Sequence, residues 1–209
     1  MQTSSPFTLR RRALTYTARM SSTSVTPLQS PARYHPVAVV LHWLLGAALV
    51  AIFALGLYMA DLPFSPQRLR YFNWHKWAGI TVLVLSFVRL LWRWTHRPPP
   101  LPASLLQAMP QWQQWAHHAT HAALYALFFA VPLLGWAYSS AAGFSVVWFG
   151  VLPLPDFVPA SEALAEVLKP LHKLSSLALA GLVLLHVAAA LKHQWVDRDG
   201  LLQRMGFGR

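Results

Sequence analysis

The stretch LHKLSSLALAGLVLLHVAAALKH, residues 171–193, decides how this sequence folds. It is long and apolar enough for a helix that crosses a membrane. It carries His172 near its start and His186 fourteen residues later. At about 100° per residue this spacing is about 40° short of four turns, so both rings leave nearly the same helix face. A rise of about 1.5 Å per residue separates them by about 21 Å, which places one ring near each side of a bilayer.

The composition of the whole chain is that of a membrane protein. Of its 209 residues, 56% are hydrophobic and only 11% are charged, whereas soluble domains have about 25% charged residues. The net charge of +11 would suit nucleic acid, but the basic residues stand at the ends of apolar runs, so no nucleic-acid partner is expected. Without cysteine, the chain cannot form disulfides, iron–sulfur ligands or thioether haem attachments.

Four apolar runs predict an all-α fold, an integral membrane four-helix bundle. Each run has about the 20 residues that a spanning helix needs. The runs cover residues 37–59, 75–94, 118–138 and 171–195. Pro132 lies inside the third run and is expected to kink that helix.

The connections between the runs are also partly predictable. Residues 98–110 are rich in proline and are expected to form an extended connector. Residues 111–117 have helical potential that would extend the third span. In the long loop 139–170 we expect a short helix over residues 161–168, with Ser161 as its N-terminal cap. Loops of this length often act as lids.

Basic residues are distributed unequally between the two sides of the expected bundle. One side would hold twelve Lys and Arg residues and the other would hold five. Because basic residues favour the cytoplasmic side, both termini are expected in the cytoplasm of a bacterial inner membrane. Trp74 and Trp77 would mark the outer interface, and Trp92 and Trp94 the inner one.

Outside the spans, residues 1–34 are rich in Ser, Thr and Pro and are expected to form a disordered, basic cytoplasmic tail. The triple arginine Arg10–Arg12 also invites a secretory interpretation, but no apolar core follows it before residue 37. Met20 is an alternative start. Residues 35–206 would form the membrane domain and residues 207–209 a short C-terminal tail.

With this orientation, four histidines match in pairs by depth. His42 and His186 lie at similar depth on the inner side, and His75 and His172 open their spans on the outer side. Each pair can supply two axial nitrogens to one planar iron porphyrin, whereas zinc would need a tetrahedral cluster. A single histidine at a helix end is often only an interfacial polar residue, so the pairing is what favours two haems between the helices.

Small residues lie one turn from three of these histidines. They are Gly46, Gly79 and Ala190. They would leave room for a flat porphyrin, and they equally suit ordinary packing of membrane helices.

Together these motifs resemble the bacterial cytochrome b561 family over residues 33–206. The resemblance is carried by Leu41-His42-Trp43, His75-Lys76-Trp77-Ala78-Gly79, Val88-Arg89-Leu90, His118 with His121 and Tyr125, Leu171-His172, residues 185–193, and Asp199-Gly200-Leu201-Leu202. It implies a four-span protein of the inner membrane with two haem b groups, whose axial ligands map to His42, His75, His172 and His186. It also implies one-electron transfer from the outer face to a quinone. One branch of the family oxidises superoxide at the periplasmic side and reduces ubiquinone near the inner haem.

Four further residues are candidates for the site. Arg89 would pair with haem propionates or reach lipid phosphate; Arg93 shares its face of the helix. His118 and His121, one turn apart, would bind propionates or pass protons to a quinone, or would be interfacial only. His193 matches a family histidine near the inner haem, so the resemblance implies a role in quinone protonation.

Two functions of different kinds fit these features. The first is a di-haem oxidoreductase that takes electrons from a periplasmic donor such as superoxide and delivers them to ubiquinone. A basic rim on the outer side would attract superoxide, and it would consist of Arg68, Arg70, Lys76 and Lys173. Four acidic residues on the same side would weaken this attraction. They are Asp61, Asp156, Glu162 and Glu166. The second function is a haem-bearing membrane anchor for a soluble dehydrogenase or cytochrome. The modest outer loops favour the oxidoreductase, because a docking platform often shows a larger apolar patch. A haem-free bundle is the third candidate, and the protein would be a monomer or a homodimer.

Overall fold

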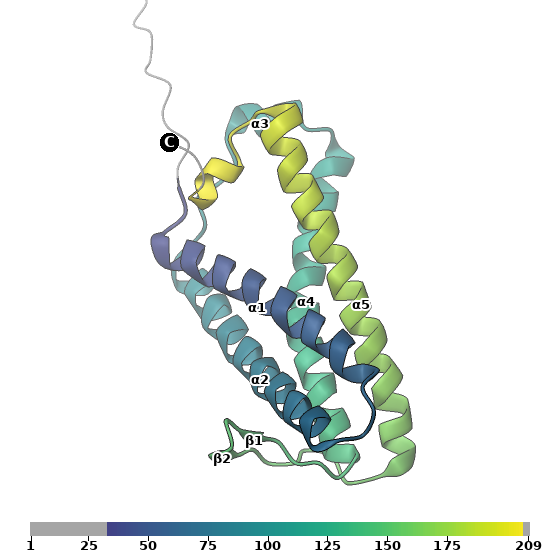
Figure 1. Cartoon of the computed structure of the whole chain (residues 1–209). Coiled ribbons are helices and arrows are strands. Elements are labelled where there is room, and N and C mark those ends of the chain that lie inside the picture. The colour runs from purple at the N-terminus through teal and green to yellow at the C-terminus, as the bar shows by residue number, and fades with distance from the viewer. Residues whose placement is uncertain (1–32, 207–209) are drawn as a thin grey trace, which may run out of the picture. The chain divides into compact units, whose positions relative to one another are not determined.

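The computed structural model describes residues 33–206 of the chain (Figure 1). Apart from Arg33 and Tyr34, the tail expected over residues 1–34 lies outside the described residues. Met20 and residues 207–209 also lie outside them.

Four long helices form the membrane bundle that the apolar runs predict. Each is long and apolar enough to cross a membrane. They are α1 (Pro36–Ala60), α2 (Pro66–Thr95), α4 (Gln111–Ala141) and α5 (Glu162–Lys192), and α5 continues into a π-helix, His193–Asp197. A short helix, α3 (Ala103–Ala108), a hairpin of β1 (Val147–Trp148) and β2 (Leu152–Pro153), and a 3-10 helix (Leu202–Met205) complete the described chain. The expected fold class is confirmed.

Helices α2 and α5 begin earlier than the sequence predicts. Helix α2 begins at Pro66, where the hydroxyl of Ser65 accepts a hydrogen bond from the Arg68 N–H at 3.2 Å. The prediction of a separate helix over residues 161–168 is wrong. Residues from Glu162 onward form the first part of α5, which continues through Pro170. Proline removes one backbone hydrogen bond, and neighbouring helices in a membrane bundle make that loss tolerable. The N-terminal cap by Ser161 is confirmed, with the Leu164 N–H donating at 3.4 Å.

Other connections differ from the sequence expectation in smaller ways. The extended connector over residues 98–110 contains α3, and α4 begins at Gln111, as the helical potential there predicts. The loop before α5 contains the hairpin β1–β2, which the sequence did not predict. Phe149 and Gly150, with φ of 52° and 73°, form its turn. Left-handed backbone is easy for Gly150 but unusual for Phe149.

Helix α1 packs on α2, α2 on α4, and α4 on α5 (Figure 1). The two ends of the described chain meet at one end of the bundle, where the Tyr34 N–H donates to the Arg204 carbonyl at 3.1 Å. There the Trp43 indole also donates to the Met205 carbonyl at 3.2 Å. We call this the His42 end, and the opposite end, which carries the hairpin, the His75 end.

Arg204 fastens the His42 end. Its side chain is only 2% exposed, and its Nη2 donates to the carbonyls of Pro99 and Pro100 at 2.7 and 2.9 Å. Its guanidinium also lies over the Tyr34 ring, 5.5 Å from the ring centroid, which is within the roughly 6 Å of a cation–π contact. One buried cation therefore joins the C-terminal segment to the α2–α3 connector and to the chain before α1.

Arg204→Met is expected to lower the free energy of unfolding by roughly 2–4 kcal/mol, because it removes charged hydrogen bonds and leaves two carbonyls without their donor. Thermal unfolding of the detergent-solubilised protein, followed by circular dichroism, measures the effect. Arg97→Met, at an exposed arginine of the same connector, is the control. Equal melting temperatures for the two variants would contradict the role given to Arg204.

Candidate functional site

At the His75 end, one histidine from α2 faces one from α5. The ring centroids of His75 and His172 are 6.2 Å apart and their planes are at 86°. The Nδ1–H of His172 donates to the Val131 carbonyl of α4 at 3.0 Å. This bond fixes the tautomer and leaves Nε2 as the free nitrogen, as in metal-binding histidines. Nδ1 of His75 is buried beside the backbone of Ile52 without a hydrogen bond of acceptable geometry.

Two glycines make room for these rings. A Cβ atom at Gly135 of α4 would lie 2.9 Å from Cε1 of His172, and one at Gly56 of α1 would lie 3.0 Å from Cε1 of His75. Both distances are below normal van der Waals contact. Each histidine of this pair therefore lies against a glycine on a neighbouring helix, and the sequence did not single out either glycine.

At the His42 end, the rings come from three helices. The centroids of His42 in α1 and His186 in α5 are 6.2 Å apart, with planes at 76°. His121 of α4 lies edge-on to His186, with centroids 5.3 Å apart, and its Nδ1–H donates to the His117 carbonyl at 2.8 Å. An N–H of Arg89 in α2 donates to Nδ1 of His42 at 2.9 Å.

The spacing within the two pairs suits a metal held between opposed imidazoles. An imidazole nitrogen binds a first-row metal at about 2.0–2.1 Å and lies roughly 1.1 Å from its ring centroid, so two opposed ligands have centroids about 6.3 Å apart. Both pairs have this spacing, 6.2 Å, whereas the 5.3 Å between His121 and His186 is shorter. At both levels this spacing would therefore suit an iron porphyrin held by one nitrogen from each ring.

The hydrogen bond from Arg89 determines which nitrogen of His42 is available to a metal. Arginine can only donate, so Nδ1 of His42 accepts and its proton lies on Nε2. A metal at Nε2 of His42 therefore requires Arg89 to release Nδ1. Arg89 would then be free for a carboxylate close to His42.

Several other residues that the sequence singled out make contacts outside the two ring pairs. His118 is exposed and its ring meets His117, with centroids 5.3 Å apart, rather than the central rings. The guanidinium of Arg93 lies 5.7 Å from the Tyr125 ring centroid. Of the small residues, a Cβ at Gly46 meets no atom within 4 Å, whereas one at Gly79 meets Ile52 at 3.7 Å, which is ordinary helix packing.

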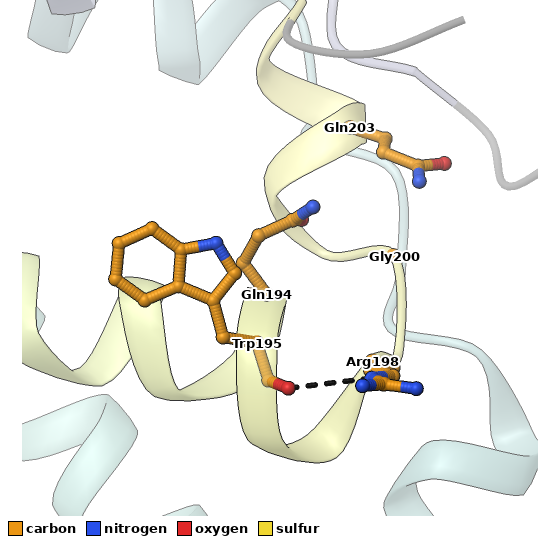
Figure 2. A pocket seen from close by; sticks show the side chains of 5 residues that line it. All are labelled: Gln194, Trp195, Arg198, Gly200 and Gln203. Atoms are coloured by element: carbon orange, nitrogen blue, oxygen red, sulfur yellow. Dashed lines mark hydrogen bonds between the residues drawn. The ribbon is translucent and has the colours of Figure 1, made fainter.

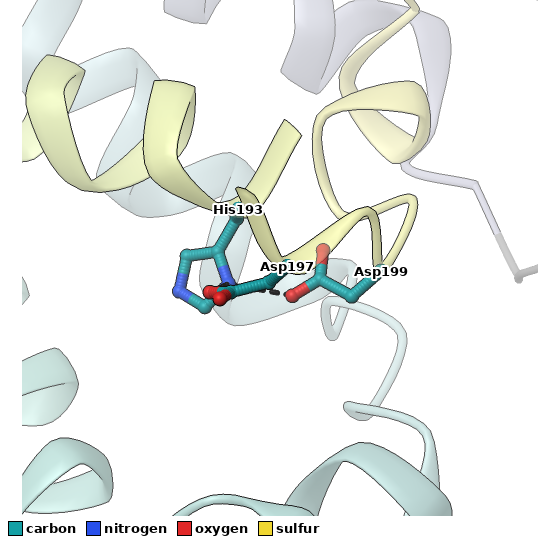
Figure 3. A group of neighbouring side chains, drawn as sticks. All are labelled: His193, Asp197 and Asp199. Carbon is teal, nitrogen blue, oxygen red and sulfur yellow. Dashed lines mark hydrogen bonds and ion pairs between the residues drawn. The ribbon is translucent and has the colours of Figure 1, made fainter. Parts of the chain in front are cut away.

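His193 begins the π-helix and lies in a cluster of charged groups (Figure 3). Its Nδ1 is 2.5 Å from an oxygen of Asp199 and 3.2 Å from one of Asp197. Among the described residues, this is the one group of three or more whose metal-ligating atoms lie within 4.8 Å of one another. The ammonium of Lys192 binds both oxygens of Asp197, at 2.6 and 2.9 Å, so the cluster is an ion-pair network that already contains its cation. Short π-helical turns in α-helices are frequent at functional sites.

A shallow groove follows the π-helix (Figure 2). It is lined by Gln194, Trp195, Arg198, Gly200 and Gln203. Arg198 has a φ of 52° and its Nε donates to the Trp195 carbonyl at 3.4 Å. The amide and guanidinium groups here offer donors to a carbonyl or phosphate oxygen at the His42 end.

At the His75 end, the expected basic rim is only partly exposed. Arg70 and Lys173 are exposed, while Arg68 and Lys76 are half-buried. Nη2 of Arg68 donates to the Ala60 carbonyl at 3.4 Å, and its guanidinium lies 5.4 Å from the Phe72 ring centroid. The four acidic residues of this side are all exposed. This end is therefore close to electrically balanced.

One acidic group of this end has a shifted titration. The nearby hydroxyls of Ser140 and Ser145 hold the pKa of Asp156 below its usual range, and that of Ser145 donates to the carboxylate at 2.6 Å. Asp156 thus stays ionised at neutral pH.

A comparison with protein-family models finds a match over all of the described chain. The model described as prokaryotic cytochrome b561 covers residues 33–208. The chain belongs to this family. Proteins of the prokaryotic cytochrome b561 family bind b-type haem and transfer electrons in the membrane, which agrees with the two opposed imidazole pairs of a four-helix membrane bundle.

Relatives of known name extend this assignment. Cytochrome b561 homolog 2 of Escherichia coli (strain K12) is 32% identical over 183 residues, 84% of this chain and 92% of the relative. Cytochrome b561 homolog 1 of the same organism is 35% identical over 131 residues, 63% of this chain and 72% of the relative. The probable superoxide oxidase CybB of Yersinia pestis is 30% identical over 180 residues, 83% of this chain and 95% of the relative.

Gly135→Ala is expected to lower the free energy of unfolding by about 1–3 kcal/mol, because the added methyl overlaps the His172 ring, which is held by its bond to Val131. Gly181→Ala is the matched control on α5, since its Cβ meets no atom within 4 Å. Alanine there should leave stability unchanged or raise it by up to about 1 kcal/mol. Thermal unfolding distinguishes the two, and a neutral Gly135→Ala would contradict the close approach.

Proposed function

We propose that this protein holds two b-type haems, one between His42 and His186 and one between His75 and His172, and passes electrons from a donor at the His75 end to ubiquinone at the His42 end. The observation that supports this most is the pair of opposed imidazoles at each level, with centroids 6.2 Å apart in both cases. The bias of basic residues favours a bacterial inner membrane with the His75 end in the periplasm and both termini in the cytoplasm.

When bound, the haems supply one-electron chemistry at two depths of the membrane. Helix α5 sets the distance between these depths, because the fourteen residues from His172 to His186 rise by about 21 Å. The Val131 carbonyl orients His172, and Gly56 and Gly135 let the outer rings lie close to the backbone. The protein's part is thus to hold the ligands in fixed orientation and to keep water from them.

Arg89 is the residue that we assign to a haem carboxylate at the His42 end. Its guanidinium already lies at His42, and bidentate binding of carboxylates is what arginine does best. His121 is the second candidate there, since its ring lies against His186 and its Nε2 is not used in the bond to His117. The exposed position of His118 favours the interfacial interpretation for that residue.

For the donor we propose superoxide. In the balanced reaction, two superoxide anions give up one electron each and become dioxygen, and one ubiquinone takes up both electrons with two protons to become ubiquinol. Support comes from the Yersinia pestis relative, whose name is probable superoxide oxidase, and from Arg70 and Lys173, which are exposed cations at the His75 end.

At the other end we propose that His193 passes protons to the quinone. The carboxylate of Asp199 accepts from Nδ1 of His193, so Nε2 is the nitrogen available to exchange a proton. Asp199 also accepts from the Leu201 N–H at 3.1 Å, which holds the carboxylate in place. Asp199 is therefore a positioning residue for His193.

A second candidate function has one observation in its favour. Phe64, a large apolar residue in the loop between α1 and α2 at the His75 end, is 81% exposed. Such a surface would also suit a haem-bearing anchor that docks a soluble dehydrogenase or cytochrome.

Rapid mixing of the purified, haem-loaded protein with superoxide tests the donor. We expect the haem absorbance to show reduction within the mixing experiment and reoxidation when ubiquinone is present. Dithionite reduction of the same sample is the control for intact haem. Haems that stay oxidised under superoxide but respond to dithionite would exclude superoxide and favour the docking function.

Alanine substitutions test the ligand pairs. We expect His42→Ala and His186→Ala to remove one haem of the two, and His75→Ala and His172→Ala to remove the other, because each variant takes away one of the two nitrogens that would hold that iron. Pyridine haemochrome counting and difference spectra measure the loss. Within a pair the lost absorbance component should be the same. Loss of both haems from all four variants would mean that the pairs are not independent.

Asp199→Asn tests the proton route. The neutral amide no longer fixes the His193 tautomer, so we expect quinone reduction to slow by about tenfold or more. Haem content and reduction by the donor should be unchanged. Asp197→Asn is the matched control, since Asp197 binds mainly Lys192. An equal rate for the two variants would contradict the role of Asp199.

A further inference from the structure

The loop between α4 and α5 contains a hairpin that exposes apolar side chains. Residues 142–155, AGFSVVWFGVLPLP, carry no charged side chain. Phe149, Val151 and Leu152 are 58%, 83% and 50% exposed. Exposed apolar groups gathered in one element generally mark an interaction surface.

Two tryptophans show how far along α2 the hairpin lies. The Trp77 indole donates to the Val147 carbonyl at 2.6 Å, and the Trp148 indole donates to the Thr81 hydroxyl at 3.2 Å. Thr81 lies about 9 Å along α2 from His75, because each residue of a helix rises about 1.5 Å. The first strand therefore lies beside the membrane-spanning part of α2 rather than beyond its end. Figure 1 shows the hairpin extending sideways next to the end of α2.

The hairpin also satisfies much of its backbone internally. Strand β1 pairs with β2, and within the turn the Gly150 and Val151 N–H groups donate to the Val147 and Trp148 carbonyls at 3.0 and 3.1 Å. At the base, the Leu154 N–H donates to Val146 at 2.9 Å. Backbone groups near hydrocarbon need such partners, because water is not there to supply them.

We propose that the hairpin, residues 147–153, is an interfacial anchor that lies at the boundary between headgroups and acyl chains of the leaflet at the His75 end. Val84, seven residues after Trp77 and therefore on nearly the same face of α2, is 43% exposed, so this side of the helix also offers apolar surface beyond the hairpin. The hairpin is uncharged, and Asp156 follows it at its base, where a carboxylate can reach water. A soluble partner would approach beyond the end of the helices, whereas this surface faces sideways. The proposal does not depend on which residues bind haem.

Single cysteines test the position of the hairpin, since the natural chain has none. The haem-loaded, full-length Val151→Cys variant is placed in lipid nanodiscs with one copy per disc and treated with a water-soluble maleimide. We expect it to react at least about tenfold more slowly than Ala160→Cys, an exposed position of the same loop, because lipid disfavours the reactive thiolate. Val50→Cys, 65% exposed in the middle of α1, gives the rate for a thiol in lipid.

Three outcomes would overturn the proposal. A rate equal to that of Ala160→Cys would place the hairpin in water. Slow labelling in native membranes with fast labelling in nanodiscs would mean that another protein covers it. Slow labelling only in discs with two copies would mean that a second copy of this chain does. Leu152→Cys repeats the measurement on the second strand if the Val151→Cys variant has an altered haem spectrum.

Discussion

The bundle depends on one physical constraint: an imidazole in an apolar segment is costly unless it has a partner. Helix α5 presents two such rings on one face, and each meets a ring from another helix, His42 of α1 or His75 of α2. The pairs thus join α5 to two helices with which it shares less of its surface than with α4. A metal between the rings of each pair would satisfy the free nitrogens and fasten these helices together.

The rest of the bundle is consistent with this constraint. Gly56 and Gly135 give the rings of His75 and His172 space, and the Val131 carbonyl orients His172. At the His42 end, the buried Arg204 holds the two ends of the described chain together and joins them to the connector after α2. The π-helix after α5 places His193 next to Asp199. Under the proposed function, haem binding and proton exchange would depend on side chains that these packing contacts hold in place.

Much of this architecture could be predicted from the sequence because membrane helices are read from hydropathy. The four spans are confirmed. The expected depth of each histidine in the membrane was enough to pair His42 with His186 and His75 with His172, whose rings lie 6.2 Å apart. The binding of haem by these pairs remains a prediction. The contacts of Gly56 and Gly135 were missed, because they depend on which helices are neighbours. The hairpin was missed because its strands have two residues each. The continuation of α5 through Pro170 was missed because a proline more often ends a helix.

The electron paramagnetic resonance spectrum of the oxidised, haem-loaded protein tests most directly whether each level holds iron between two imidazoles. The ring planes lie at 76° and 86° in the two pairs. Two imidazoles with nearly perpendicular planes give ferric haem a low-spin signal of strong anisotropy. We predict two such signals and no high-spin signal. A high-spin ferric signal that accounts for one haem or both would show that a level offers iron only one nitrogen, and would contradict the paired arrangement.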